Sequence, residues 1–313
     1  MKSTLNNAAL VVLNYNTPEL TIGAVRHVTE LNTGIRLIVV DNASTDDSWK
    51  KLNATFEGES DVVLCRSPKN GGYAKGNNLG LSLAEKLGGV EYVGIMNPDV
   101  VVGKDVLYAL VAALKQDKTI GLVTTQVIYN GRKLNPNPCA WNKSGLLRWL
   151  IGVTMLGTLL RRLSRRLVGR EVDLIGYTDS KDLSEAINSV FAVQGCFFFG
   201  RLELMRAIGG FDERTFLYYE EDILAEKVCS RGLKNAVLRD FWIEHNHQVK
   251  EASLESARQR LFHMRCEFES RCLYLKEYAK YRLFLSQVLT LIWKFDFAVK
   301  KGSFRLCIEI KYD

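Results

Sequence analysis

The chain contains the stretch Leu37-Ile38-Val39-Val40-Asp41-Asn42-Ala43-Ser44, in which an apolar run leads directly into a polar loop. A short apolar run of this kind is typical of a buried parallel strand, because both faces of such a strand are covered. The run Ala8–Leu13 precedes it, and Thr17-Pro18-Glu19 between them has the N-cap and first-turn proline of a helix. These features predict a strand–helix–strand unit.

The alternation of strand and helix patterns continues along the chain. It predicts strands at Val62–Cys65, Val90–Met96 and Ile120–Ile128, and helices from Asp46, over Ala74–Leu87 and over Lys104–Gln116. From Phe191 it predicts a strand at Phe191–Phe199, helices at Leu202–Ile208 and Glu220–Ser230, and a strand at Ala236–Leu238. The predicted fold class is α/β, with a mostly parallel sheet flanked by helices and a C-terminal helical appendage.

Three polar residues follow predicted strands directly. Asp41 ends the run quoted above, and Asn97 and Asp99 follow the strand at Val90–Met96. Ligands of open α/β sheets bind beyond the carboxyl ends of the strands. We therefore expect these three side chains to lie at one edge of the sheet, beside a ligand site.

A second polar feature is Phe216-Leu217-Tyr218-Tyr219-Glu220-Glu221-Asp222-Ile223-Leu224, where three adjacent carboxylates stand between aromatic residues and an apolar helix start. Adjacent carboxylates repel one another, and aromatic cover adds a desolvation cost. A site that removes a proton from a hydroxyl has a use for such groups. The alternative is an acidic first turn that only complements the helix dipole.

Five segments of the chain form a pattern when they are taken in order. They are Val11–Asn16, Val40–Ser48, Asn70–Asn78, Met96–Asp99, and Gly209–Glu213 leading into Glu220–Asp222. In this order they resemble the family 2 glycosyltransferases, which have the GT-A nucleotide-sugar-binding fold. The resemblance is closest to the rhamnosyltransferase-like branch, which builds bacterial surface polysaccharides.

The resemblance implies a nucleotide site at the strand ends. In that site Asp41 accepts the imide N–H of a uracil or thymine base, and Leu13 and Tyr15 hold the base. The alternative for Asp41 is a plain turn that caps the next helix. The nucleotide-binding residues implied in this way are Leu13, Tyr15, Asp41, Gly72, Asn77 and Asn97.

Asn97-Pro98-Asp99 stands where the family has its Asp-x-Asp motif. A carboxylate there binds Mg²⁺ or Mn²⁺, which neutralises the diphosphate leaving group. Asn97 replaces the first carboxylate and removes one formal charge, while Asp99 remains as a metal ligand. The resemblance adds His245 as a second ligand, although a lone histidine is more often structural and His247 is an alternate.

The resemblance also implies an inverting reaction, in which a carboxylate deprotonates the acceptor hydroxyl. Matching the family's Glu-Asp pair to Glu221-Asp222 makes Asp222 the base, and this is the match we favour; matching it one residue earlier makes Glu221 the base. The implied acceptor-side residues are Gln194, Gly195, Cys196 and Asp212.

The charge of the chain is unevenly distributed. The formal net charge is +7, and Asn142–Arg170 holds seven Lys or Arg residues and no carboxylate. Within it, leucines follow helical spacing while Arg161, Arg162, Arg165 and Arg166 take the other face. This pattern favours an amphipathic segment on an anionic membrane surface over a solvated helix packed on the domain.

Two further features concern location and domains. The N-terminus has no apolar signal segment, and no apolar run reaches the roughly 20 residues that span a bilayer. We therefore expect a cytoplasmic protein peripherally associated with the inner face of the cell membrane. We expect a GT-A domain over residues 1–250, with a basic insertion at about 140–182, and a helical membrane-proximal region over 251–313.

The predicted function is that of an inverting glycosyltransferase with a divalent metal. It moves a sugar from a UDP- or dTDP-sugar, with dTDP-rhamnose among the donors, to a saccharide acceptor, expected to be lipid-linked, in polysaccharide biosynthesis. One alternative is a nucleotidyltransferase, which would need a triphosphate loop that Asn14-Tyr15-Asn16-Thr17 does not provide. Another is a non-catalytic nucleotide-sugar or nucleic-acid binding protein. We expect no nucleic-acid partner, because the clustered cations lie beside leucines rather than stacking aromatics.

Overall fold

The computed structural model describes residues 4–143, 183–246, 254–279 and 290–299, together with residues 166, 177, 178, 287 and 302. The basic segment predicted around Arg161–Arg166 therefore lies almost wholly outside the described residues. Within the described residues, no helix is both long enough and apolar enough to cross a bilayer. The division into residues 1–250 and 251–313 stays a prediction.

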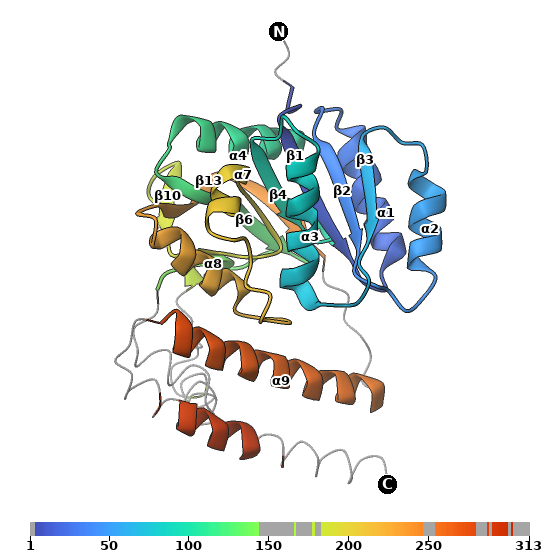
Figure 1. The fold of residues 1–313 in the computed structure, drawn as a ribbon. Coiled ribbons are helices and arrows are strands. Elements are labelled where there is room, and N and C mark those ends of the chain that lie inside the picture. The colour runs from blue at the N-terminus through green and yellow to red at the C-terminus, as the bar shows by residue number, and fades with distance from the viewer. Residues whose placement is uncertain are drawn as a thin grey trace.

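A large mixed sheet runs through the middle of the molecule (Figure 1). Its main strands follow the order β10-β13-β6-β12-β4-β1-β2-β3, and β5 and β7 pair with β13 and β6. The strands are β1 (Ala8–Asn14), β2 (Arg36–Asp41), β3 (Val62–Arg66), β4 (Tyr92–Met96), β5 (Val100–Val101), β6 (Ile120–Tyr129), β7 (Arg132–Lys133), β10 (Ile187–Val190), β12 (Phe197–Arg201) and β13 (Lys234–His245).

The directions of the strands divide this sheet into two parts. Strand β1 is parallel to β2 and to β4, and β2 is parallel to β3, as βαβ units require. Strand β12 is antiparallel to both β4 and β6. A smaller sheet has the order β11-β8-β9, with β8 (Asn137–Trp141), β9 (Tyr177–Thr178) and β11 (Ala192–Val193).

Helices cover the sheet, and one long helix lies along its edge. The covering helices are α1 (Pro18–Glu30), α2 (Ser48–Phe56), α3 (Gly72–Lys86), α4 (Lys104–Gln116), α7 (Leu202–Ala207) and α8 (Glu220–Cys229). Helix α9 (Leu254–Glu277) runs across the lower edge of the sheet in Figure 1, below α3 and α8. This edge is the one at which α3 and α8 begin.

The predicted α/β class with helices flanking the sheet is confirmed, and the sheet that was predicted to be mostly parallel is mixed, because β12 is antiparallel to both of its neighbours. One predicted strand is wrong, because Phe191–Phe199 is divided into β11 and β12 by the loop Gln194-Gly195-Cys196. In that loop Gln194 N donates to Cys139 O at 2.8 Å and Gly195 N to Glu221 Oε1 at 3.1 Å. An apolar run cannot reveal such a break. The predicted strand at Ala236–Leu238 is the centre of the longer β13.

The core is densest where β4 and β12 pair. Phe197, Phe198 and Phe199 are all buried, and since successive strand residues point to opposite faces, both faces of β12 are covered. Gly94 pairs with Phe199, and a Cβ at residue 94 would lie 2.5 Å from the Phe199 ring. Glycine therefore makes room for the phenylalanine ring at this point of the sheet.

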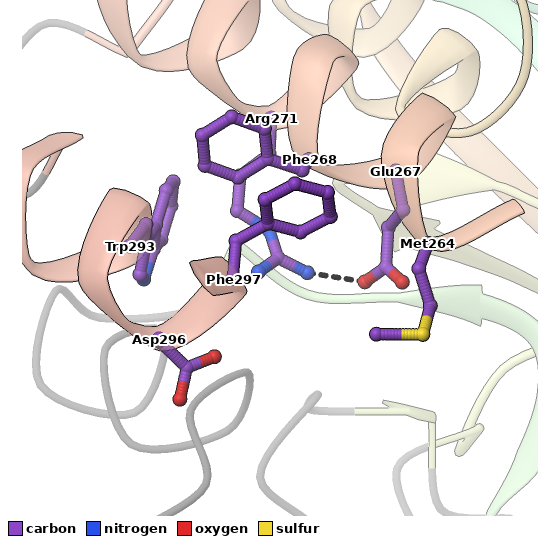
Figure 2. Close-up of a pocket in the computed structure, with 7 residues that line it drawn as sticks. All are labelled: Met264, Glu267, Phe268, Arg271, Trp293, Asp296 and Phe297. Atoms are coloured by element: carbon purple, nitrogen blue, oxygen red, sulfur yellow. Dashed lines mark hydrogen bonds and ion pairs between the residues drawn. The ribbon is translucent and has the colours of Figure 1, made fainter. Parts of the chain in front are cut away.

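A second apolar cluster joins α8, α9 and a helical segment at residues 290–299. Figure 2 shows the small pocket between the last two, where Trp293 and Phe297 face α9. The Phe297 ring stacks on Phe268 with centroids 4.6 Å apart, and the Arg271 guanidinium lies 4.8 Å from the centroid of the Trp293 ring. Arg271 also pairs with Glu267, so a buried cation is partnered on both sides.

Gly72 begins α3 at a crowded position. Its φ is +81°, and a Cβ there would lie 2.2 Å from Phe216 O. Gly58 has a similar φ of +85°, but no atom lies within 4 Å of the site of its Cβ. Both glycines therefore need a positive φ, but only Gly72 has a backbone atom so close that it leaves no room for a Cβ.

We expect Gly58→Ala to lower the free energy of unfolding by about 1–2 kcal/mol, the cost of a side chain in the left-handed region. Gly72→Ala should lower it by about 1–3 kcal/mol more, because the methyl group must displace the Phe216 backbone. Urea denaturation of both variants measures the difference. Equal losses would contradict a rigid contact between Gly72 and Phe216.

Candidate active site

The ends of β1 and β2 hold a buried carboxylate in a fixed orientation. Asp41 is fully buried, and its Oδ1 accepts a hydrogen bond from Asn14 Nδ2 at 2.8 Å. Its Oδ2 accepts from Ser44 N at 3.3 Å and lies 3.3 Å from Arg66 Nε. Each donor comes from a different segment, so the carboxylate belongs to the framework beneath the strand ends. Its burial is compatible with its charge because these partners replace water.

Asp99 and His245 meet beside the end of β4. His245 ends β13 and pairs with Val100, and its Nε2 lies 3.2 Å from Asp99 Oδ1. The histidine is buried and its ring lies 5.0 Å from the Tyr129 ring, whereas the Asp99 side chain keeps 16% of its surface exposed. The structure thus brings together the two predicted metal ligands, which lie far apart in the sequence.

This pair of donor atoms fits a divalent metal that is shared with a substrate. A carboxylate oxygen and an imidazole nitrogen both bind Mn²⁺, and Mg²⁺ in phosphate sites takes one or two protein ligands plus phosphate oxygens and waters. Within the described ranges, no group of three or more His, Cys, Asp or Glu residues could hold a metal. Asp99 and His245 therefore suit an ion whose remaining ligands come from a diphosphate.

The loop Gln194-Gly195-Cys196 connects this pair to the acidic helix. Asn97 N donates to Cys196 O at 2.8 Å, and Gly195 N donates to Glu221 Oε1 at 3.1 Å. A Cβ at residue 195 would lie 2.7 Å from Glu221 Oε1, so only glycine permits this approach. Burial raises the pKa of the Cys196 thiol, and the Asp99 and Glu221 carboxylates raise it further. Both carboxylates thus lie near Cys196.

The three adjacent carboxylates occupy different environments. Glu220 is buried, and its Oε1 has no hydrogen-bond partner among the described residues. Burial, and then the charge of Glu221, raise the pKa of Glu220 to about 8. Burial raises the pKa of Asp222 to about 7, although Trp141 Nε1 donates to its Oδ1 at 3.1 Å. Burial also raises the pKa of Glu221, and the Gly195 N–H opposes this rise.

The turn before these carboxylates has an unusual backbone. Tyr218 and Tyr219 have φ values of +74° and +65°, a region that costs non-glycine residues on the order of 1–3 kcal/mol each. Helix α9 holds the turn: Ser270 Oγ donates to Leu217 O at 2.9 Å, and Arg271 Nε donates to Tyr219 Oη at 3.0 Å. Sequence reasoning missed this role of α9, because its contacts join residues more than fifty positions apart.

The remaining predicted nucleotide residues lie around the start of α3. Tyr15 is 42% exposed beyond the end of β1, and Leu13 is partly buried against Gly76. Gly72 allows the start of α3 to lie against Phe216, whose carbonyl accepts from Tyr73 N at 2.9 Å. Asn77 is fully buried and donates to Tyr73 O within its own helix, so the structure does not bring it to the open side of the strand ends.

Asp212, predicted on the acceptor side, is bound by other protein groups. Its Oδ2 accepts from Arg214 Nη2 at 2.7 Å and from Tyr278 Oη at 2.6 Å. Burial alone would raise the pKa of Asp212, but these hydrogen bonds and the Arg214 charge outweigh it and hold the pKa well below its usual range. The structure places Asp212 in a link to the end of α9, whereas Gln194, Gly195 and Cys196 lie between Asn97 and Glu221.

Comparison with known proteins gives related curated sequences. The hexosyltransferase Agl10 of low-salt glycan biosynthesis, from Haloferax volcanii, is 23% identical over 82% of this chain and 73% of its own length. Glycosyltransferase GlyG of Streptococcus pneumoniae is 30% identical over 36% of this chain, but the match spans only 38% of GlyG.

Solved structures have the same fold at low sequence identity. GalNAc-T7, solved with UDP, GalNAc and Mn²⁺, has a TM-score of 0.60 at 13% identity, over 87% of this chain and 49% of its own. The mannosyltransferase PcManGT of Pyrobaculum calidifontis, solved with GDP-Man and Mn²⁺, has a TM-score of 0.53 at 17% identity, over 87% of this chain and 64% of its own. These neighbours confirm the predicted GT-A fold.

The family comparison covers the parallel strands of the sheet and stops before the acidic helix. The family model described as glycosyl transferase family 2 matches residues 9–201, which is more than half of the chain. The match includes β1 to β4 with Asp41, Asn97 and Asp99, and it ends before Glu221. The predicted glycosyltransferase family is confirmed, and the chain belongs to glycosyl transferase family 2.

Proposed function

We propose that this chain is an inverting glycosyltransferase that moves a sugar from a UDP- or dTDP-sugar to a saccharide hydroxyl. The observation that carries the proposal is the short hydrogen-bonded connection from Asn97, beside Asp99 and His245, through the Cys196–Gly195 loop to Glu221. It places a site suited to a diphosphate next to a carboxylate suited to a base. Glycosyl transfer needs both groups within one substrate length.

The donor nucleotide would lie over the ends of β1, β2 and β4. Asp41 is fully buried against Asn14 and Arg66, so it would accept an imide N–H only after the partly exposed Arg66 side chain moves aside, whereas the exposed ring of Tyr15 suits stacking on a base directly. An imide N–H is present in uracil and thymine, which supports UDP- and dTDP-sugars. GalNAc-T7 was solved with UDP, which supports the same class, whereas PcManGT was solved with GDP-Man.

Asp99 and His245 would hold the divalent metal. A bound Mg²⁺ or Mn²⁺ supplies positive charge that stabilises the departing nucleotide diphosphate. In this chain the burial of His245 and its ring contact with Tyr129 fix the imidazole beside the carboxylate. Asn97 adds no charge, so the site keeps one carboxylate, and the diphosphate supplies the remaining negative charge.

We propose Glu221 as the general base, with Asp222 as the alternative that the sequence pattern favoured. Glu221 accepts a hydrogen bond from Gly195 N, and the next residue, Cys196, accepts one from Asn97 N. Asp222 instead accepts a hydrogen bond from Trp141, which lies in the smaller sheet. Glu221 therefore lies nearer to the proposed diphosphate site. Glu220 is excluded as the base because it is buried and lacks access to a substrate.

The reaction then proceeds in one displacement. The carboxylate takes the proton from the acceptor hydroxyl as that oxygen forms a bond to the anomeric carbon. The bond from that carbon to the diphosphate oxygen breaks, and its electron pair leaves with the nucleotide diphosphate. Attack from the face opposite the leaving group inverts the configuration at the anomeric carbon.

A lipid-linked acceptor on an anionic membrane surface remains part of the proposal. The helical segment at residues 290–299 buries Trp293 against α9 and exposes Leu291, Phe295 and Val299, which follow one another at four-residue spacing (Figure 2 shows the buried face). Phe295 is 74% exposed, and Lys294 beside it is exposed as well. An exposed apolar stripe next to an exposed lysine suits the interface of a bilayer. The glycan-synthesis role in the name of Agl10 supports a polysaccharide product.

The first test separates the carboxylates. Glu221→Gln should lower kcat by about 10²–10⁴-fold and leave the Kd for UDP within about twofold, because the amide keeps the shape and removes the proton acceptor. Glu220→Gln is the matched control and should change kcat little near neutral pH, since the raised pKa of Glu220 already keeps it largely protonated there. Transfer by wild-type protein should fall as the pH is lowered, and the fall should begin above the usual range of a glutamate, because burial raises the pKa of Glu221 and the base must be ionised.

The outcome for Asp222→Asn decides whether Glu221 or Asp222 is the base. If Glu221 is the base, Asp222→Asn should retain measurable turnover and the acid limb of its pH profile. Loss of turnover in Asp222→Asn, together with near-normal turnover in Glu221→Gln, would assign the base to Asp222. Normal turnover in both variants would refute the role of this cluster in catalysis.

The second test separates the metal site from the base site. Asp99→Asn should abolish the gain in UDP affinity that Mn²⁺ produces, because Asp99 would bind only the metal ion. The affinity for UDP in the presence of chelator should be unchanged. Asp41→Asn should weaken UDP binding about tenfold or more under both conditions, since it addresses the base. Isothermal titration with UDP and dTDP, in EDTA and in Mn²⁺, measures both effects. Equal loss under both conditions in Asp99→Asn would contradict its assignment as a ligand.

The third test addresses the membrane. Replacing Leu291 and Phe295 by Ser should lower partitioning to vesicles that contain phosphatidylglycerol by about tenfold or more, because the exposed apolar face is lost. Reversing Arg161, Arg162, Arg165 and Arg166 to Glu is the comparison, and its effect should shrink as salt rises. Co-sedimentation measures both variants. Unchanged binding in the Leu291 and Phe295 variant would exclude this face as the anchor.

A further inference from the structure

A cluster of aromatic rings stands at the surface beside the acidic helix. We define the aromatic platform as Phe216, Tyr218, Phe262 and His263. Phe216 meets Phe262 edge to face with centroids 5.4 Å apart, and His263 lies 5.9 Å from both the Phe262 and the Tyr218 ring. Tyr218 is 42% exposed and Phe262 is 46% exposed. The platform is therefore one connected group of rings that presents large aromatic faces to solvent.

The platform is held in a defined shape. Tyr218 Oη and His263 Nδ1 lie 2.9 Å apart, which joins the turn before α8 to the first half of α9. The Phe216 carbonyl accepts from Tyr73 N at 2.9 Å and fixes the turn to the start of α3. Tyr218 has a φ of +74°, so the backbone adopts a costly conformation where its ring is exposed. The strained turn that precedes the α8 carboxylates thus also leaves the Tyr218 ring exposed beside them.

The position of the platform links it to the proposed reaction. Tyr218 stands two residues before Glu220, and the Phe216 carbonyl bonds the backbone of Tyr73. The Tyr73 hydroxyl donates to Gly195 O at 2.6 Å, and the Gly195 N–H bonds Glu221. Two residues, Tyr73 and Gly195, therefore link the platform to the carboxylate proposed as base. A molecule that offers a hydroxyl to Glu221 can extend from there towards the platform.

The chemistry of the platform fits a sugar ring. A pyranose ring has a face of C–H groups with slight positive charge, and an aromatic ring has a negative face, so the two attract when they stack. A carboxylate at the edge of such a stack can accept from sugar hydroxyls, and Glu267 lies on the same helix as Phe262, one turn from His263. Stacked rings bordered by polar groups are the composition expected of a saccharide site.

We propose that the aromatic platform binds a sugar unit of the acceptor saccharide, next to the unit whose hydroxyl is glycosylated. The proposal rests on the proposed glycosyltransferase function and deepens it by naming an acceptor subsite. The subsite sets which saccharides are accepted, because its contacts lie outside the donor residues. Donor binding does not depend on it.

Disaccharide binding to the full chain tests the subsite. The probes are maltose, cellobiose and lactose, measured by saturation-transfer NMR in the presence of UDP and Mn²⁺. Wild-type protein should bind at least one of them, and Phe262→Ala should weaken that binding about tenfold. Phe262→Leu should lose as much, because leucine keeps apolar bulk without an aromatic face, whereas Phe262→Tyr should retain binding. Phe295→Ala, which removes an exposed ring elsewhere, is the matched control and should bind like wild type.

Separate readouts distinguish this proposal from the function on which it rests. The Kd for UDP and the thermal unfolding temperature should be unchanged in every Phe262 variant. Absence of binding by all three disaccharides, or equal binding by wild type and Phe262→Ala, would overturn the subsite while UDP binding and donor hydrolysis still support the enzyme. Loss of vesicle binding in Phe262→Ala, with disaccharide binding unchanged, would assign the platform to a bilayer instead. Absence of donor hydrolysis in wild type would overturn the enzyme and not the sugar contact.

Discussion

The mutual repulsion of three adjacent carboxylates is the constraint on which the rest of the site depends. The fold separates their environments instead of pairing them with cations. Glu220 turns into the protein, Glu221 reaches the Gly195 N–H, and Asp222 reaches the Trp141 indole. Each of these arrangements needs a specific backbone path before α8, which the two left-handed tyrosines provide. Helix α9 offsets the strain of that path, because two of its side chains donate hydrogen bonds to Leu217 and Tyr219 in the turn.

The molecule divides into two halves with different physical character. The half proposed to bind the donor is built from parallel strands whose ends carry Asp41 and Asn97, and the family model matches this part of the chain. The half proposed to bind the acceptor is built from long-range contacts of the 209–226 segment with α9 and Tyr278, beyond the family match. The loop Gln194-Gly195-Cys196 joins the two halves, because Cys196 is hydrogen-bonded to Asn97 and Gly195 is hydrogen-bonded to Glu221. Substitutions in the 209–226 segment or α9 are therefore expected to leave Asp41, Asn97 and Asp99 in place.

What could be predicted from the sequence follows the same division. Apolar runs and strand ends located β1, β2 and β4 and placed Asp41, Asn97 and Asp99 at one edge, because these patterns are local. The partner of Asp99 could be named only from the family resemblance, since His245 is distant in the chain. The break in the strand at Gln194–Cys196 and the capture of Asp212 by Tyr278 could not be predicted, because both depend on contacts between distant segments. The choice between Glu221 and Asp222 depends on one residue of register, which a repeated acidic pattern cannot fix.

The hydrogen bonds between α9 and the turn before α8 also limit which chimeras of two related chains can fold. A crossover placed after β13 would pair the strained turn of one parent with the helix of another. The new helix would need hydrogen-bonding side chains opposite Leu217, Tyr219, Glu226 and Asp212, which Ser270, Arg271, Tyr274 and Tyr278 supply here. A chimera that keeps residues 209–279 from a single parent preserves all four contacts. Residues 209–279 thus form one block whose contacts must be exchanged together, and this block crosses the apparent boundary between the sheet and the terminal helices.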